Sequence, residues 1–235
     1  MHGSALNMHN WEILRNNVMD DPFSLEKNIE SYERSCESQK DNYAIAKIIV
    51  NHILETEREN NKLVSLGVGK GSLEYLIKKL CPALYVECTD YTADALEKLK
   101  RVSIQMDNIH TFDMLNDSYA SLGKDSTFLL FRVSTEFDVN QWNMIFNKMY
   151  FDEIENIIFV PTELATNDII VKEKMRYIKN MIRLRKNMFC GWLYSEEEFL
   201  KMFKGQNPSP LYDIEKRIPY NDTAIFFLKR HHPNN

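Results

Sequence analysis

The sequence predicts an α/β protein with a doubly wound, mostly parallel sheet of seven strands, a C-terminal antiparallel hairpin and an N-terminal helical extension. Two patterns lead to this fold class. Five short apolar segments alternate with helical or polar segments between residues 62 and 160, which is the order of a parallel sheet with crossover connections. Two further strand-like segments, residues 211–217 and 223–229, are separated by the turn-forming residues 219–222, which predicts a hairpin.

The N-terminal part of the chain has the pattern of helices. Across residues 11–59, apolar residues recur at three- and four-residue steps, and no glycine or proline follows Pro22 in this range. We therefore divide the chain into a helical extension, residues 1–59, and a sheet domain, residues 60–235. A basic segment, residues 166–192, lies inside the sheet domain.

The first strand leads into a glycine-rich loop within residues 62–77. Three of the chain's seven glycines stand here, at Gly67, Gly69 and Gly71, between a short apolar run and a helical pattern. Glycine is needed where the backbone has a positive φ or where another molecule comes very close. Strand, tight loop and helix form an arrangement in which a ligand lies over the loop. Turn geometry alone also explains three glycines, and the glycines by themselves do not decide between these explanations.

The next strands follow in order. Residues 83–89 have strand composition and are followed by Asp90 and by Thr92, which can cap the next helix. Residues 108–112 form a shorter unit with only a weak helix after it. Residues 127–133 are almost continuously apolar, as expected of a strand buried on both faces of a parallel sheet.

Polar residues follow the fourth and fifth strands. The fifth strand, residues 157–160, is stopped by Pro161. Ligands of doubly wound sheets bind outside the carboxyl ends of the strands. The residues expected near a ligand for this reason are Arg132, Ser134, Thr135, Glu136, Thr162 and Glu163.

Composition excludes several classes of protein. No run of about 18 apolar residues is long enough to cross a bilayer, and no signal peptide precedes the helical segment, so we expect a soluble, cytoplasmic protein. The four cysteines are scattered without a CxxC pair, which argues against a zinc site and a disulfide framework. We expect no metal. The net charge of −5 provides no general attraction to nucleic acid.

Three ligands compete for the glycine loop. A phosphate-binding P-loop requires Lys followed by Ser or Thr after the last glycine, but Lys70 lies between glycines. A dinucleotide site prefers glycine or alanine at Ser72, although Asp90 has the spacing of a ribose-binding acid. The third ligand is an adenosine whose attached amino acid approaches the loop backbone.

At these residues, from about position 40 to position 230, the chain resembles class I, Rossmann-like S-adenosylmethionine-dependent methyltransferases. Residues 67–71 match the GxGxG motif of that family, and the C-terminal strand pair resembles the hairpin that separates it from dinucleotide-binding enzymes. The family usually has an acid two residues before the first glycine, where this chain has Ser65. The resemblance implies S-adenosylmethionine as the cofactor, bound by Ser65, Gly67, Gly69, Gly71, Asp90, Tyr91, Asp113, Met114 and Arg132.

The same resemblance implies methyl transfer to a small-molecule acceptor with a hydroxyl or amine nucleophile. Glu136 and Glu163 are the candidate catalytic bases, because a base within reach of the nucleophile assists the transfer. The basic segment lies where the family commonly has a substrate lid, which suggests an anionic acceptor; a solvated helix face explains it equally well. The candidate substrate-binding residues are Tyr32, Ser134, Thr135, Arg183 and Arg185.

Two other functions stay open at this point. Ser65 leaves the amino group of the ligand with one anionic neighbour fewer, so the chain could bind S-adenosylmethionine without transferring its methyl group. The basic segment could instead contact RNA, which the acidic total disfavours. Residues 160–163 lack the Asn/Asp-Pro-Pro-Tyr/Phe element of enzymes that methylate nucleic-acid amino groups. No sequence feature sets the oligomeric state.

Overall fold

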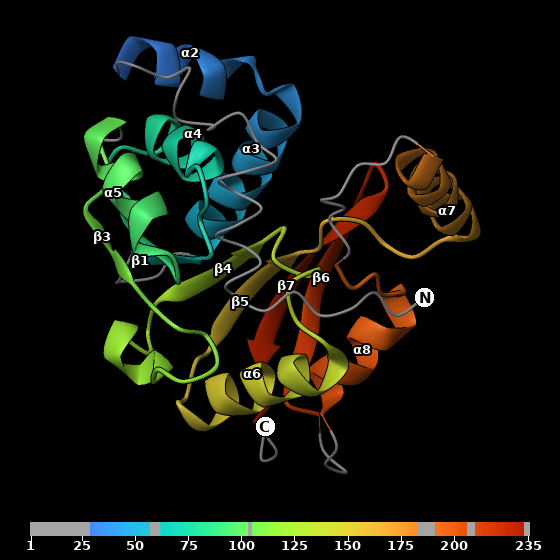
Figure 1. Ribbon diagram of the computed structural model, residues 1–235. Coiled ribbons are helices and arrows are strands. Elements are labelled where there is room, and N and C mark those ends of the chain that lie inside the picture. The colour runs from blue at the N-terminus through green and yellow to red at the C-terminus, as the bar shows by residue number, and fades with distance from the viewer. Residues whose placement is uncertain (1–28, 57–61, 103–104, 183–190, 206–209, 233–235) are drawn as a thin grey trace.

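The computed structural model describes residues 29–56, 62–102, 105–182, 191–205 and 210–232. Within them, one seven-stranded sheet has the order β3-β2-β1-β4-β5-β7-β6 (Figure 1). Strands β1 to β5 are parallel, and β7 runs antiparallel to both β5 and β6. The strands are β1 (Lys62–Leu66), β2 (Tyr85–Asp90), β3 (Asn108–Thr111), β4 (Thr127–Phe131), β5 (Asn156–Val160), β6 (Tyr212–Tyr220) and β7 (Thr223–Arg230). The predicted fold class is confirmed.

Helices cover both faces of this sheet (Figure 1). Helices α3, α4 and α5 lie on one face and α6 and α8 on the other, while α2 packs on α4 and α7 stands beside the sheet near the end of the hairpin. The helices are α2 (Ile29–Ser38), α3 (Lys40–Glu55), α4 (Ser72–Leu80), α5 (Ala93–Val102), the 3₁₀ helix η1 (Tyr119–Leu122), α6 (Val139–Phe151), α7 (Asn167–Ile182) and α8 (Glu196–Lys204). The division into an extension and a sheet domain stays a prediction.

Alternation of side chains along the strands divides the core into two clusters. On β1, Val64 belongs to the cluster shared with α6 and α8, and Leu63 to the cluster shared with α3 and α4. Phe159 of β5 lies among aromatic rings of the first cluster, with its ring centroid 4.9 Å from that of Phe199 and 5.4 Å from that of Trp142. These edge-to-face contacts fix the sheet from which the functional loops emerge.

The hairpin is longer than the sequence predicts. Strand β6 continues to Tyr220, so the turn consists of Asn221, with φ +47°, and Asp222, and the predicted turn at residues 219–222 begins two residues too early. Pro219 lies inside the strand. Because β6 is the edge strand of the sheet, a residue without an N–H is tolerated there.

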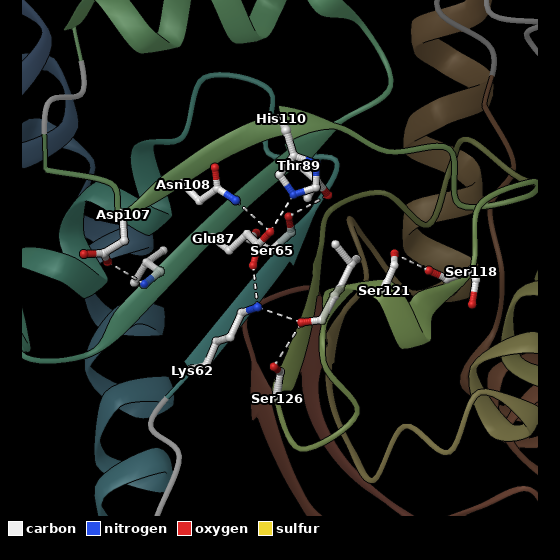
Figure 2. A network of polar contacts seen from close by, with 12 residues as sticks. Lys62, Ser65, Glu87, Thr89, Asp107, Asn108, His110, Ser118, Ser121 and Ser126 are labelled. Carbon is white, nitrogen blue, oxygen red and sulfur yellow. Dashed lines mark hydrogen bonds and ion pairs between the residues drawn. The ribbon is translucent and has the colours of Figure 1, made fainter.

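The third crossover forms only η1 between β3 and β4, in agreement with the weak helix expected there. On the same side of the sheet, Glu87 of β2 contacts polar side chains from the two neighbouring strands, β1 and β3 (Figure 2). Its carboxylate lies 2.6 Å from Lys62 Nζ and 2.5 Å from His110 Nε2, and it accepts a 3.0 Å hydrogen bond from Asn108 Nδ2. Burial acts to raise the pKa of Glu87, but the hydrogen bonds from Lys62 and His110 outweigh it and lower that pKa. His110 therefore has a structural role here.

Cys36 and Cys88 are buried free thiols and Cys81 is partly buried, whereas Cys190 lies outside the described residues. None of the described helices is both long and apolar enough to cross a membrane.

A capping box at the start of α8 supports a first mutational prediction. The Ser195 hydroxyl accepts from the Glu198 N–H at 3.3 Å, and the Glu198 carboxylate accepts from the Ser195 N–H at 2.7 Å. Ser195→Ala is expected to lower the free energy of unfolding by about 1 kcal/mol, because it leaves a helix N–H without its partner. Urea denaturation measures this, with the exposed Ser38→Ala as a control that changes stability by less than about 0.5 kcal/mol. Equal effects of the two substitutions would contradict the cap.

Candidate functional site

The glycine loop lies where a doubly wound sheet binds ligands. Strand β1 is flanked by β2 on one side and β4 on the other, so the order of the strands reverses at β1. The loop leaves the carboxyl end of β1 at this position. Gly67, Gly69 and Gly71 have φ values of +71°, +56° and +66°, so all three adopt the left-handed conformation that glycine permits. The need for positive φ in this loop is confirmed.

Strand β2 holds the loop through its backbone and through Asp90. The N–H groups of Gly67 and Val68 donate to the Thr89 carbonyl at 2.8 and 3.0 Å, and the Gly69 N–H donates to Asp90 Oδ2 at 2.9 Å. The other carboxylate oxygen, Oδ1, accepts from the N–H and the hydroxyl of Thr92 at 2.9 and 2.7 Å. Asp90 therefore joins the loop to the start of α5. Its contact with a ribose stays a prediction.

The helical extension also reaches the loop. The hydroxyl of Tyr32, on α2, donates to the Lys70 carbonyl at 2.9 Å. The hydroxyl oxygen of Tyr32 would lie 3.3 Å from a Cβ placed on Gly71. Tyr32 is almost completely buried, so this side chain positions the loop backbone. A further role for Tyr32 toward a substrate stays a prediction.

A buried carboxyl group lies beside the end of β1. Glu74, in the first turn of α4, is 2% exposed, and its Oε1 accepts a 2.5 Å hydrogen bond from the hydroxyl of Ser65. Burial raises the pKa of Glu74 to about 7, against the opposing effect of the Ser65 hydrogen bond and with a smaller contribution from the negative charge of Asp90. Ser65 therefore stands where the family usually has an acid, but its hydroxyl is hydrogen-bonded to the carboxyl group of Glu74.

The other side of the loop is apolar. A Cβ on Gly67 would lie 2.6 Å from Val133 Cγ1 and 3.9 Å from Met114 Cε, so Gly67 lies against two buried apolar side chains. Met114 therefore lies next to the loop, and its contact with a cofactor stays a prediction. Asp113 accepts hydrogen bonds from the N–H groups of Leu115 and Asn116 at 2.9 and 3.3 Å, so its carboxylate stabilises the turn after β3.

Two more predicted cofactor residues lie at strand ends. Tyr91 directly follows β2 and its side chain is 45% exposed. Arg132 follows β4 with φ +57°, a strained conformation for a residue with a side chain, and its guanidinium lies 5.0 Å from the centroid of the Phe131 ring. Such strain is typical of functional sites, where the surrounding structure maintains it.

Hydrogen bonds join the ends of β4 and β5. The buried Ser134 hydroxyl accepts from the Thr162 N–H at 2.9 Å, and the Thr162 hydroxyl donates to the Arg132 carbonyl at 3.0 Å. The Thr135 carbonyl accepts from the Trp192 N–H at 2.9 Å. The predicted strand-end residues therefore come together, and segment 191–194 lies next to them.

The two candidate bases differ in their surroundings. Glu136 is partly exposed after β4, where its N–H donates to the Val133 carbonyl at 3.1 Å. The carboxylate of Glu163, after β5, lies 3.9 Å from Lys172 Nζ of α7. Arg183 and Arg185 lie outside the described residues. The catalytic and substrate-binding roles of all four stay predictions.

Comparison with solved structures identifies the fold. The chain is similar to magnesium protoporphyrin IX methyltransferase (ChlM) from Synechocystis PCC 6803 with bound S-adenosylhomocysteine (SAH), with a TM-score of 0.60, 12% identity, and coverage of 95% of this chain and 94% of that chain. This chain has the class I methyltransferase fold. The fold is also that of the pyocyanin biosynthetic protein PhzM, with a TM-score of 0.58, 14% identity, and coverage of 95% and 68%.

A third similar structure is an O-methyltransferase family 2 protein from Planctomyces limnophilus DSM 3776 in complex with apigenin. Its TM-score is 0.55 at 16% identity, and the match covers 72% of this chain and 51% of that one, so this chain corresponds to about half of that protein's length. A structure described as a putative zinc-dependent alcohol dehydrogenase from Rhodobacter sphaeroides matches at a TM-score of 0.57, so the likeness extends to the fold and not to an activity. No protein-family model and no curated protein sequence matches the chain.

The residues of the loop fit the cofactor of this methyltransferase fold. Gly69 and Asp90 offer a small, anionic edge, Met114 offers an apolar surface, and Glu74 adds a second acid. Sequence inspection missed Glu74, although its place three residues after Gly71 puts it in the first turn of the helix that follows the loop.

Proposed function

We propose that this chain binds S-adenosylmethionine over the loop of residues 67–71 and transfers its methyl group to a small-molecule acceptor. One observation carries the proposal: three left-handed glycines lie at the carboxyl end of β1, in a sheet whose last two strands form the antiparallel hairpin of the class I methyltransferase fold. In similar structures of that fold, ChlM from Synechocystis PCC 6803 was crystallised with SAM and with SAH.

Each part of the site would have a defined task. Bound S-adenosylmethionine supplies an activated methyl group on a positively charged sulfur. Asp90 and the glycine loop would hold the cofactor, and Met114 would contact its adenine. The strand-end residues would align the acceptor and exclude water, which is the main contribution of a protein to a displacement reaction. Glu136 or Glu163 would accept the proton of a hydroxyl or amine acceptor.

Helix α7 would form part of a substrate lid. Val171, Met175 and Ile178 are exposed on α7 at spacings of four and three residues, so they lie on one face of the helix and leave it unpacked in this structure. Lys172 lies close to Glu163 and to Asp222 of the hairpin turn, at 3.9 and 3.8 Å, which places α7 next to a candidate base. An acceptor with both an apolar and an anionic part would suit such a lid.

The double substitution Arg183→Ala and Arg185→Ala tests the lid. If an anionic acceptor is bound there, the variant is expected to raise the KM for that acceptor about tenfold and to leave the Kd for S-adenosylmethionine unchanged, because a charge-assisted hydrogen bond is lost at the acceptor only. Loss of cofactor binding to the same extent, or no change in either constant, would contradict the proposal.

Calorimetry and a turnover assay test the proposed function itself. Titration with S-adenosylmethionine and with SAH should show one binding site each, and failure to bind either ligand overturns the proposal. Release of SAH is then measured with apigenin, benzoate and a primary amine as probe acceptors. Binding without turnover by any acceptor would favour a protein that binds the cofactor without catalysis, which Ser65 suggested.

Asp90→Asn is expected to weaken S-adenosylmethionine binding about tenfold or more. The amide keeps the size of the side chain but loses the charge, and it places a donor where the Gly69 or Thr92 N–H now donates. Calorimetry provides the Kd. Asp94→Asn is the matched control, because this acid lies in the first turn of the adjacent helix α5 with its side chain 72% exposed. Equal affinity of the wild type and Asp90→Asn would show that Asp90 does not hold the cofactor loop.

A further inference from the structure

Glu74 is a buried carboxyl group whose charge is not balanced by the protein. Glu74 lies in the first turn of α4, and its carboxylate accepts a hydrogen bond from the Ser65 hydroxyl, which is neutral. Among the residues that the structure describes, no lysine, arginine or histidine forms an ion pair with it. The negative charge of Asp90 acts on Glu74 as well and raises its pKa further.

Glu87 is a second buried carboxylate, and it is paired with basic side chains. Glu87 is 5% exposed, close to the 2% of Glu74, and it lies on the neighbouring strand β2. It is paired with Lys62 and His110. A buried carboxyl group without a cation meets a large desolvation cost in its charged form, and a cationic ligand bound nearby would offset that cost. The contrast between the two glutamates points to a cationic ligand above Glu74.

The position of Glu74 also opposes the other ligands of glycine loops. Phosphates bind at helix N-termini because the backbone N–H groups and the helix dipole attract negative charge. At the N-terminus of α4, the ionised carboxylate of Glu74 would offset this attraction. A dinucleotide would therefore meet repulsion at the same loop, whereas a ligand with an ammonium group would meet attraction.

We propose that Glu74 selects the cofactor by attracting the ammonium group of its methionine part, with Ser65 holding the carboxylate in position. This role rests on the proposed binding of S-adenosylmethionine. Glu74, on helix α4, would be the anionic neighbour of the ammonium group that Ser65, on strand β1, does not provide. Glu74 acts through its charge across the loop. It takes no part in the transfer of the methyl group.

Binding of three ligands to the Glu74→Gln variant tests this role. S-Adenosylmethionine and SAH both carry the ammonium group, whereas 5′-methylthioadenosine lacks the whole amino-acid part. Glu74→Gln keeps an acceptor for the Ser65 hydroxyl, removes the charge and places an amide donor at the other oxygen position. We expect the Kd values of S-adenosylmethionine and SAH to rise about tenfold at pH 8, and the Kd of 5′-methylthioadenosine to stay the same, by calorimetry. Glu87→Gln is the matched control and should leave the Kd values of all three ligands unchanged.

Each other outcome overturns a definite part of the proposal. Equal weakening of all three ligands would mean that Glu74 supports only the shape of the loop, and no weakening would mean that it does not act on the ligand. Weakening of S-adenosylmethionine alone would assign the attraction to the sulfonium and overturn the ammonium assignment. Failure of the wild type to bind S-adenosylmethionine would overturn the proposed function, and the role of Glu74 with it.

Discussion

Replacing Gly67 with alanine is expected to lower the free energy of unfolding by about 3 kcal/mol and to weaken S-adenosylmethionine binding at least about a hundredfold. The new Cβ would lie 2.6 Å from Val133 Cγ1, and φ at this position is +71°. Valine is stiff about χ1, so it cannot move aside at small cost. The loop backbone must shift instead, and with it the N–H groups that Thr89 and Asp90 hold.

Urea denaturation and calorimetry measure the two effects of Gly67→Ala separately. Gly123→Ala is the matched control, because Gly123 also has a positive φ, +94°, but follows η1 and lies next to Ser126. The control should lose about 1 kcal/mol of stability and keep the wild-type Kd. If both variants lose stability and neither loses affinity, the loop is a structural turn and the ligand binds elsewhere.

The second large effect concerns the pH dependence of stability. The pKa of Glu74 is raised from its ordinary value of 4.5 to about 7 by burial. A carboxyl group with a raised pKa stabilises the folded state fully below its unfolded pKa, and this contribution is lost as the pH rises through the folded pKa. Between pH 4.5 and pH 8 the wild type should therefore lose on the order of 3 kcal/mol through this group. Glu74→Gln should remove that loss.

Urea denaturation at pH 5 and pH 8 checks this expectation in the absence of ligand. Glu87→Gln provides a control of opposite sign, since the lowered pKa of Glu87 stabilises the fold above its unfolded pKa and that contribution is lost as the pH falls. If the wild type and Glu74→Gln have the same difference in stability between the two pH values, Glu74 is not buried as an acid in solution.

Local patterns were sufficient to predict the fold and the location of the candidate site. The glycines marked the loop because positive φ is a property of single residues, and the apolar segments marked the strands of the sheet. The edge of the hairpin was the exception: Pro219 predicted a turn, but strand β6 continues through it because its outer edge has no neighbour in the sheet.

What the sequence by itself determined is the order of strands and helices, the conformation of the glycine loop and the residues at the strand ends. These follow from side-chain periodicity and from backbone preferences, which depend on neighbours in the chain. Only the tertiary structure decided which side chains meet at the loop. Tyr32 binds the Lys70 carbonyl because α2 packs on α4, and Ser65 binds Glu74 because β1 and α4 bring these two side chains together. The sequence shows only that Ser65 is not an acid. The structure shows that its hydroxyl is hydrogen-bonded to Glu74, a contact that depends on the directions of two side chains in space.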